Sequence, residues 1–233
     1  VDRAVIVPPT WVGENNLTAI EAAAKYPRRF AVMGRFDPMT PDAADRLEAW
    51  KSQPGMLGIR MTYRIPPYNS WLDDNTLDWF WDACERLAIP VMNLVGGVPR
   101  KLAPIAERHP GLPLIVDHMA RDLELKGAPA FADIEELISL AGYANIYVKV
   151  SSVPNFSGEA YPYSDLDPFM RRLYDAFGPQ RLMWGSDITR LEGGYTNCIN
   201  HFRQALPFLS EEDREWITGR STAEVLNWPE STP

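Results

Sequence analysis

Hydrophobic and polar positions repeat along the chain as a short apolar run, a polar loop and an amphipathic segment with helical spacing. The seven apolar runs predict strands at residues 3–9, 30–36, 56–63, 90–95, 113–118, 146–151 and 182–187. The seven amphipathic segments predict helices at roughly residues 16–26, 41–52, 75–87, 99–108, 129–141, 165–177 and 194–206. The C-terminal segment 210–228 predicts two further short helices, the first capped by Ser210.

Strict alternation of strand and helix predicts a parallel sheet with helical crossovers. The first predicted strand is not followed by a G-x-G-x-x-G or P-loop pattern, which argues against a doubly wound nucleotide-binding sheet. Polar residues gather instead at the C-terminal ends of several strands, which is typical of a barrel with its active site on that face. We therefore predict an α/β fold of the (β/α)8 TIM-like barrel type.

This barrel is expected to form one domain over residues 1–233 and to lack its first strand. The pattern predicts seven strands, whereas a complete barrel has eight and typically about 250 residues. The chain begins "VDRAVIVPP", without an initiator Met and almost directly on a strand. The sequence thus predicts that an N-terminal βα unit precedes Val1.

Side chains alternate along a strand, so each strand turns one face to the helices and the other to the barrel interior. In residues 56–64 the apolar face belongs against the helices, which turns the arginines of this strand inward. The same reasoning, applied to the other strands and their ends, gives an interior set of Arg60, Arg64, Asn93, His118, Lys149 and Asp187. We interpret Asp117 as a loop or helix-side partner, and His109 and His201 as structural.

The chemistry of this set favours hydrolysis or acid–base catalysis. Asp187 ends the apolar run "LMWGSD", where a charge is costly unless it is needed, and it suits a general base or a metal ligand. His118 suits a general acid, a general base or a ligand. Arg60 and Arg64 present forks suited to a substrate carboxylate, with an internal ion-pair network as the alternative. Lys149 would balance Asp187 or polarise an oxygen.

Composition limits the partners. The chain is 45% hydrophobic and carries a net charge of −8, which argues against nucleic acid and anionic membranes as partners. No apolar run approaches the ~20 residues that span a bilayer. The two cysteines, Cys84 and Cys198, lie far apart in helix-like segments, which favours a reduced, cytoplasmic protein. A homodimer is the default expectation for a barrel enzyme.

Several motifs, taken in order, resemble a known family. They are "YPRRFAVMGRFDP", "MLGIRMTYR", "PLIVDHMARD", "IYVKVSS", "RLMWGSDIT" and "ITGRSTAEVLNW". Together they cover nearly the whole chain and are similar to the amidohydrolase-related branch of the amidohydrolase superfamily. Within it, they most resemble the 2-pyrone-4,6-dicarboxylate lactonase and sugar lactonase group. The resemblance implies a distorted (β/α)8 barrel, with His118 and Asp187 in the active site and a carboxylate-binding arginine near Arg60 or Arg64.

Two departures from the family pattern concern metal. The first strand of the family ends in His-x-His, which this chain does not contain. Metal-dependent members also carry a histidine where Asn93 stands, and an amide is a poor substitute for imidazole at a transition-metal site. The resemblance thus implies hydrolysis without a cofactor. A divalent zinc or manganese ion, held in part by His118 and Asp187, is the alternative for a longer protein.

The sequence therefore predicts a metal-independent, lactonase-like hydrolase acting on a lactone or ester of a small carboxylated substrate. Asp187 would activate water, with His118 and Lys149 as the other catalytic residues. The expected substrate-binding residues are Arg60, Arg64, Asn93 and Tyr163, the last in an aromatic loop over the cleft. A metal-dependent decarboxylase or hydratase of a carboxylated ring is one alternative, and an inactive barrel serving as a binding module is another.

Overall fold

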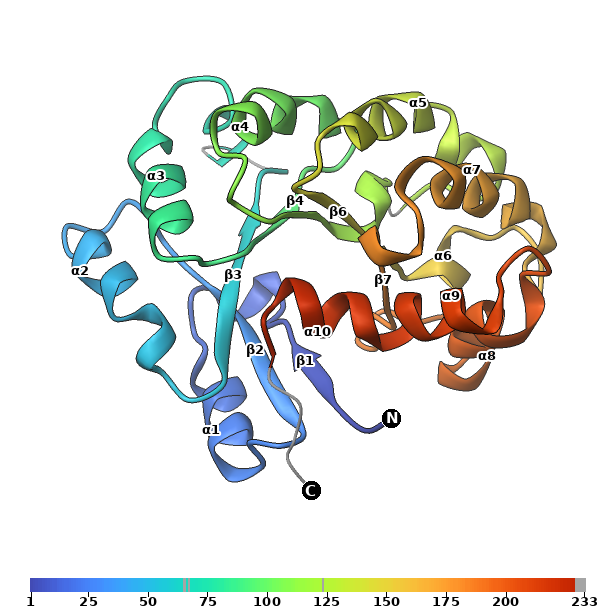
Figure 1. Cartoon of the computed structure of the whole chain (residues 1–233), viewed down its shortest axis with the longest axis horizontal. Coiled ribbons are helices and arrows are strands. Elements are labelled where there is room, and N and C mark those ends of the chain that lie inside the picture. The colour runs from blue at the N-terminus through green and yellow to red at the C-terminus, as the bar shows by residue number, and fades with distance from the viewer. Residues whose placement is uncertain (65, 67, 123, 229–233) are drawn as a thin grey trace.

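Seven parallel strands, joined by helices, curl into an open barrel in the computed structural model (Figure 1), which describes residues 1–64, 66, 68–122 and 124–228. The strands pair in chain order from β1 to β7. Their bounds are Ala4–Ile6 (β1), Phe30–Arg35 (β2), Met56–Thr62 (β3), Val91–Leu94 (β4), Leu114–Val116 (β5), Ile146–Ser151 (β6) and Leu182–Gly185 (β7). This arrangement confirms the predicted parallel, barrel-like α/β fold.

The helices that connect successive strands lie on the outer side of the sheet, as the crossovers of a parallel barrel require, whereas the C-terminal α10 contributes Val225 to the inner layer. Their bounds are Leu17–Lys25 (α1), Ala43–Glu48 (α2), Asp78–Arg86 (α3), Ala103–Arg108 (α4), Ile134–Ile138 (α5), Val153–Phe156 (α6), Asp167–Phe177 (α7), Tyr195–Asn200 (α8), Glu211–Glu215 (α9) and Ser221–Val225 (α10). Within the described part of the chain, none is long and apolar enough to cross a bilayer.

Two helical predictions differ from the structure. The C-terminal segment forms one continuous helical run over residues 211–225, because the π-helical turn Trp216–Arg220 joins α9 to α10. The predicted cap is confirmed: Ser210 and Asp213 form a reciprocal capping box at the start of α9. The short helix α6 was not predicted, because its residues were assigned to a loop.

Alternating residues of each strand divide the core into two layers. The larger layer lies between sheet and helices and takes the outward residues, among them Ile59, Val91 and Val148. A smaller layer fills the concave side of the sheet with residues such as Met33, Met92, Ile115 and Met183. These inward positions establish which residues further along each strand face the interior.

β1 and β7 do not pair with each other in the described residues, so the barrel stays open between them. The C-terminal segment packs at this side. Val225 and Trp228 belong to the inner layer, against which Val5 of β1 packs, and Arg3 stacks over the Trp228 ring at 4.6 Å. The expectation of an eighth strand, preceding Val1, stays a prediction.

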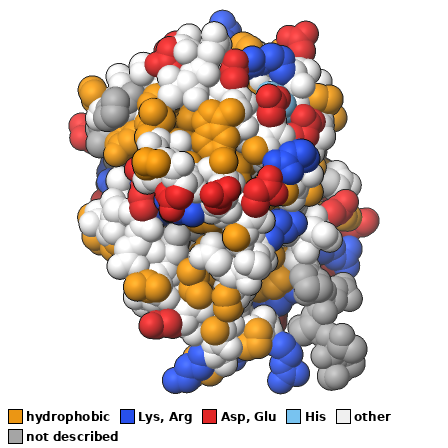
Figure 2. Space-filling view, turned by 90° about the vertical axis from the view of Figure 1, so that its left-hand side faces the viewer, with side chains coloured by type: hydrophobic (Ala, Val, Ile, Leu, Met, Phe, Trp, Pro, Cys, Tyr) orange, Lys and Arg blue, Asp and Glu red, His pale blue; other side chains and the backbone are white. Residues whose placement is uncertain are grey.

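The molecular surface is mixed in character. On the face shown in Figure 2, hydrophobic side chains gather in the upper half and a row of Asp and Glu side chains lies below them. Acidic residues are in excess in the whole chain, which carries a net charge of −8. This acidic exterior contrasts with the cavity at the C-terminal ends of the strands.

Candidate active site

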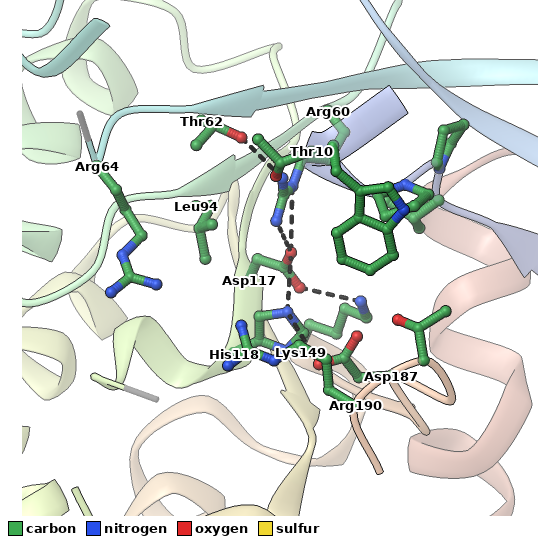
Figure 3. A pocket seen from close by; sticks show the side chains of 15 residues that line it. Thr10, Arg60, Thr62, Arg64, Leu94, Asp117, His118, Lys149, Asp187 and Arg190 are labelled. Carbon is green, nitrogen blue, oxygen red and sulfur yellow. Dashed lines mark hydrogen bonds and ion pairs between the residues drawn. The ribbon is translucent and has the colours of Figure 1, made fainter. Parts of the chain in front are cut away.

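A cavity of about 350 Å³ opens at the C-terminal ends of the strands (Figure 3). Its walls come from the loop after β1, from β3 and β4, and from the C-terminal ends of β5, β6 and β7 and the residues that follow them. The lining residues are Val7, Pro8, Pro9, Thr10, Trp11, Arg60, Thr62, Arg64, Leu94, Asp117, His118, Lys149, Asp187, Thr189 and Arg190. Active sites of barrel enzymes lie on this face.

Asp117 is the centre of the cavity floor, with only 1% of its side chain exposed. Its Oδ2 accepts hydrogen bonds from Arg60 Nη2 at 2.9 Å and Nε at 3.3 Å. Its Oδ1 accepts from Lys149 Nζ at 3.0 Å. The interpretation of Asp117 as a loop or helix-side partner was therefore wrong. Ile115 faces the interior, so strand alternation turns Asp117 inward as well.

Asp117 is ionised at neutral pH. Burial raises the pKa of this carboxyl. The influence of His118, Lys149 and Arg60 outweighs burial and holds that pKa well below its usual range. A carboxylate buried this deeply is tolerable only because fixed cations compensate its charge. Asp117 thus orients the two cations rather than acting as a base.

His118 reaches the same cavity because the backbone leaves the strand at this residue. Its φ is 49°, in the left-handed region, so the regular alternation that would send it outward no longer applies. Its Nδ1 lies 2.7 Å from Ser151 Oγ. Its Nε2 lies 3.4 Å from Asp117 Oδ2 and 3.8 Å from Asp187 Oδ2. Two carboxylates beside Nε2 favour the tautomer protonated there, with Ser151 donating to Nδ1.

The imidazole of His118 is neutral at pH 7. Burial lowers its pKa to about 4, and the nearby Lys149 acts in the same direction. The negative charge of Asp117 opposes this shift without overcoming it. A neutral His118 offers one N–H donor to the cavity and adds no positive charge to it.

Asp187 follows β7 and lies at the wall of the cavity opposite Arg64. Its backbone φ is 53°. Ser152, itself at a φ of 61°, donates from Oγ to Asp187 Oδ2 at 2.8 Å. Non-glycine residues in this backbone region are strained and occur often at functional sites. The Asp187 side chain is 17% exposed, so water reaches a carboxylate that the protein holds in a fixed orientation.

The two predicted arginines differ in what they can bind. Arg60 is 93% buried and is committed to Asp117, with Nη1 also donating to Thr62 Oγ1 at 2.7 Å. This is the internal ion pair that the sequence left open as the alternative. Arg64 is a third exposed, and its contact with Asp122 is long, at 3.9 Å. In Figure 3 it points into the cavity from the wall opposite Asp187, which leaves it free for a ligand.

Two predicted substrate-binding residues lie outside the cavity. Asn93 points to the helix side, where it donates to the Val91 carbonyl at 2.8 Å and accepts from the Tyr63 hydroxyl at 3.4 Å. Met92 and Leu94 face the interior in its place, since side chains alternate. Tyr163 is buried against His201, with ring centroids 5.7 Å apart, and supports a loop. Both predictions were wrong.

Sequence reasoning gave no role to several residues that the structure brings to the site. Ser151 and Ser152 hold His118 and Asp187 respectively, and Arg190 lines the cavity beyond Asp187. Alternation turns Ser151 of β6 inward together with Lys149, as observed, but it does not reveal the contact with His118. Ser152 could not be found in this way, because its left-handed backbone breaks the alternation.

The loop after β7 is fixed by one amide. Asn155 Nδ2 donates to the Arg190 carbonyl at 2.6 Å, and its Oδ1 accepts from the Glu192 backbone N–H at 3.1 Å. This bridge holds the segment that carries Arg190 against α6. The loop is therefore pre-organised around the cavity.

The described residues do not fit a transition metal. A catalytic zinc site commonly has three protein ligands, and no cluster of three suitable His, Cys, Asp or Glu side chains occurs in the described part of the chain. His118 and Asp187 could supply two donors. The third nearby carboxylate, Asp117, is occupied by Arg60 and Lys149, whose charges oppose a cation.

Charge in the cavity is opposite to that of the whole chain. Its lining holds four cationic side chains, Arg60, Arg64, Lys149 and Arg190, against two carboxylates, Asp117 and Asp187. One carboxylate is neutralised by internal ion pairs, whereas the other faces water beside a neutral imidazole. The arrangement suits general-base activation of water and binding of an anionic molecule.

Comparisons with known proteins show the family to which this chain belongs. Residues 1–228 match the sequence profile of the family described as amidohydrolase. The L-fucono-1,5-lactonase of Burkholderia ambifaria is 29% identical over 202 residues, which cover 84% of this chain and 68% of that protein.

Two solved structures have a similar fold. One is an amidohydrolase from Burkholderia multivorans with bound zinc, with a TM-score of 0.82 and 22% identity, covering 98% of this chain and 84% of that one. The other is a candidate 2-pyrone-4,6-dicarboxylic acid hydrolase from Pseudomonas putida, with a TM-score of 0.77 and 18% identity, covering 97% and 82%. At these identities the likeness concerns the fold alone.

Proposed function

Because the chain belongs to the amidohydrolase family, as the motifs predicted, we propose that it opens the ring of a small carboxylated lactone by adding water. The lactonase named among its relatives supports this reaction class. The observation that carries the proposal is the water-accessible Asp187 carboxylate beside a neutral His118, in a cavity lined mainly by cations.

Asp187 is the general base of the proposed reaction. Ser152 occupies its Oδ2, which turns the remaining carboxylate edge toward water in the cavity. The carboxylate takes a proton from water as the oxygen attacks the lactone carbonyl carbon. The same proton then passes from Asp187 to the ring oxygen as the carbon–oxygen bond breaks, which yields a hydroxy acid.

Lys149 and His118 stabilise the negative charge that develops on the carbonyl oxygen. Lys149 is fixed by its 3.0 Å bond to Asp117, and the Nε2–H of His118 lies between the two carboxylates. Donors held in place before the reaction cost little reorganisation during it. Asp117 positions both groups and exchanges no proton.

Arg64 and Arg190 bind the substrate carboxylate in this account, because Arg60 is committed to Asp117. Both line the cavity, and Arg64 has a weak internal partner only. Guanidinium groups bind carboxylates through paired hydrogen bonds. This assignment makes the substrate a small anion, in keeping with the cationic lining.

The proposed hydrolysis does not use a metal, since the donor set of the described residues does not fit one. A metal-dependent decarboxylase or hydratase therefore has less support. The inactive-barrel alternative has less support too, because base and donors converge in one cavity. The cytoplasmic location and the homodimer expected from the sequence remain part of this proposal.

Activity on a panel of carboxylated lactones tests the proposal. The protein should release one acid equivalent per lactone, measured by pH-stat, and chelator should not reduce the rate. The proposal would be contradicted if the protein opened none of the carboxylated lactones. It would also be contradicted if activity stopped on chelation and returned when zinc was added.

A further inference from the structure

Arg35, the last residue of β2, is a buried cation with unused hydrogen-bonding capacity. Its side chain is 8% exposed, and within the described part of the chain it forms an ion pair with Glu14 alone, with 3.6 Å between Nη2 and Oε1. Its Nε and Nη1 are fully buried and have no hydrogen-bond partner among the described residues. Buried donors of this kind normally find a partner, and buried charges are costly without one.

Glu14 compensates the charge of Arg35 only in part. The opposing carboxylate, Glu14, is a third exposed and makes a long contact. Arg60 adds a like charge, since Arg35 and Arg60 are paired in the register of β2 and β3. Burial lowers the pKa of Arg35, and Arg60 lowers it further. An anion arriving here would relieve both effects.

Arg35 lies beside the active-site cavity. β2 stands between β1 and β3, and the cavity lining includes residues 7–11, which follow β1, together with Arg60, Thr62 and Arg64 of β3 and the segment after it. Arg35 lies behind this lining and is not part of it. Met33 faces the interior, so alternation turns Arg35 inward too. The side chain is covered by the loop after β1, whose Glu14 contacts the guanidinium and whose Asn16 holds the Arg35 backbone at both N–H and C=O.

We propose that Arg35 is a further anion-binding residue of the active site, which takes a carboxylate oxygen of the substrate in place of its weak partner Glu14. The identity of the anion as a lactone carboxylate rests on the proposed function. The unused donors at Nε and Nη1, and the long contact at Nη2, give the guanidinium capacity for one more carboxylate.

Glu14 is suited to being displaced. Burial raises the pKa of its carboxyl and outweighs the opposing effect of Arg35. It follows Gly13, whose φ of 61° places a flexible residue in the loop. A substrate carboxylate that meets the guanidinium with both oxygens at hydrogen-bonding distance would be a stronger partner than Glu14, whose contact is 3.6 Å long.

Substrate pairs of similar shape and different charge test the role of Arg35. We would compare a carboxylated lactone with its methyl ester in wild type, in Arg35→Met and in the control Arg46→Met, which removes an arginine near Glu14 whose side chain is a third exposed. Arg35→Met should lower kcat/KM for the acid about tenfold to hundredfold and for the ester less than about threefold. Arg46→Met should change neither. Equal losses on acid and ester, or no loss, would overturn the proposal.

Binding without turnover separates this proposal from the proposed function. In an Asp187→Asn background, calorimetry of the carboxylated hydroxy acid should show the same loss of affinity on Arg35→Met. This result is expected even if wild type opens no lactone. Unchanged affinity would refute the role of Arg35 while leaving hydrolysis standing.

Glu14→Gln keeps the test valid if Arg35→Met does not fold. This variant removes the competing charge and retains the size of the side chain, so Arg35 is freer to bind substrate. KM for the carboxylated lactone should fall several-fold, whereas KM for the ester should stay unchanged. A KM for the acid that stays constant or rises would contradict the proposal.

Discussion

Asp117 is the residue through which the site is organised. Arg60 and Lys149 are oriented by its two oxygens, and His118 lies within 3.4 Å of it. All three groups are largely buried, so water could replace the lost carboxylate only in part. The stability of the fold and the geometry of catalysis therefore depend on the same side chain.

Replacing Asp117 by Asn should destabilise the protein by about 3–5 kcal/mol, because two cations lose a buried counter-charge. The measurement is the free energy of unfolding in urea. Asp175→Asn is the matched control, since Asp175 pairs with Arg171 on the surface of α7 and should cost less than about 1 kcal/mol. Equal effects of the two substitutions would contradict the structural role given to Asp117.

The depressed pKa of His118 predicts how stability depends on pH. The unfolded chain takes up a proton on this residue near pH 6.5, and the folded protein only near pH 4. The unfolded state thus binds more protons between these values, so stability should fall as the pH is lowered from about 6.5 to 4. The loss attributable to His118 is on the order of 3 kcal/mol.

Unfolding free energies of wild type and His118→Gln, measured between pH 4 and pH 7, check this expectation. The variant should lose much of the slope. His201, whose pKa burial also lowers, contributes to both proteins and cancels in the difference. A wild type whose stability is flat in this range, or a variant with the same slope, would show that His118 is not held neutral.

At the residue scale, sequence reasoning succeeded where strands are regular. Alternation placed Arg60 and Lys149 in the interior, as observed. It failed at the end of β5, because the all-apolar run "LIV" does not reveal its inward face and because His118 leaves the β region. Asp117 and His118 therefore reach the same cavity, although they are adjacent in sequence.

At the scale of elements, the loop between β7 and α8 determines the position of the base. It carries Asp187 and Arg190, and Asn155 bridges it to α6. Gly193 in this loop has a φ of +73°, and a Cβ added there would lie 2.6 Å from the Tyr163 hydroxyl. Tyr163, expected at the substrate, thus fits closely against the loop instead.

Gly193→Ala should destabilise the protein by about 1–3 kcal/mol, from backbone strain and from the clash with Tyr163. It should also lower kcat/KM, because the loop shifts. In a Tyr163→Phe background the steric part should disappear and about 1 kcal/mol should remain. Gly219→Ala, which meets no atom within 4 Å, is the control. A penalty that Tyr163→Phe does not reduce would contradict this packing.

Elements were predictable in type and order more than in detail. Periodicity located each strand, whereas the predicted helix 129–141 is a series of short 3₁₀ and α turns. The C-terminal run 211–225 is continuous because a π turn over Trp216–Arg220 joins the two short helices that the pattern predicts. Such irregularities depend on how side chains of different elements pack together, and the spacing of hydrophobic residues along the chain gives no information on this packing.

At the scale of the whole molecule, an acidic protein surrounds a cationic cavity. The fold was predictable because alternating strands and helices leave few topologies, and a seven-strand open barrel is one of them. The charge of the cavity was predictable in part, through Arg60, Arg64 and Lys149. Arg35 was overlooked, although it alternates with the apolar residues of β2.

The contrast between the acidic chain and its cationic cavity predicts that salt affects charged substrates more than neutral ones. Raising NaCl from about 0.01 to 0.5 M should lower kcat/KM for a carboxylated lactone several-fold, because screening weakens its attraction to the exposed Arg64 and Arg190. The methyl ester of the same lactone should change less than about twofold. Equal salt dependence of acid and ester would show that cavity charge does not select the substrate.

The central claim is that Asp187 activates water for lactone hydrolysis without a metal, and one measurement tests it most directly. The measurement compares kcat/KM on a carboxylated lactone for wild type and Asp187→Asn, both after exhaustive chelation. Asp175→Asn is the folding control. We predict full activity for wild type and the control, and a loss of about 10²–10⁴-fold for Asp187→Asn. An Asp187→Asn protein within tenfold of wild type, or a chelated wild type that is inactive until zinc is restored, would contradict the claim.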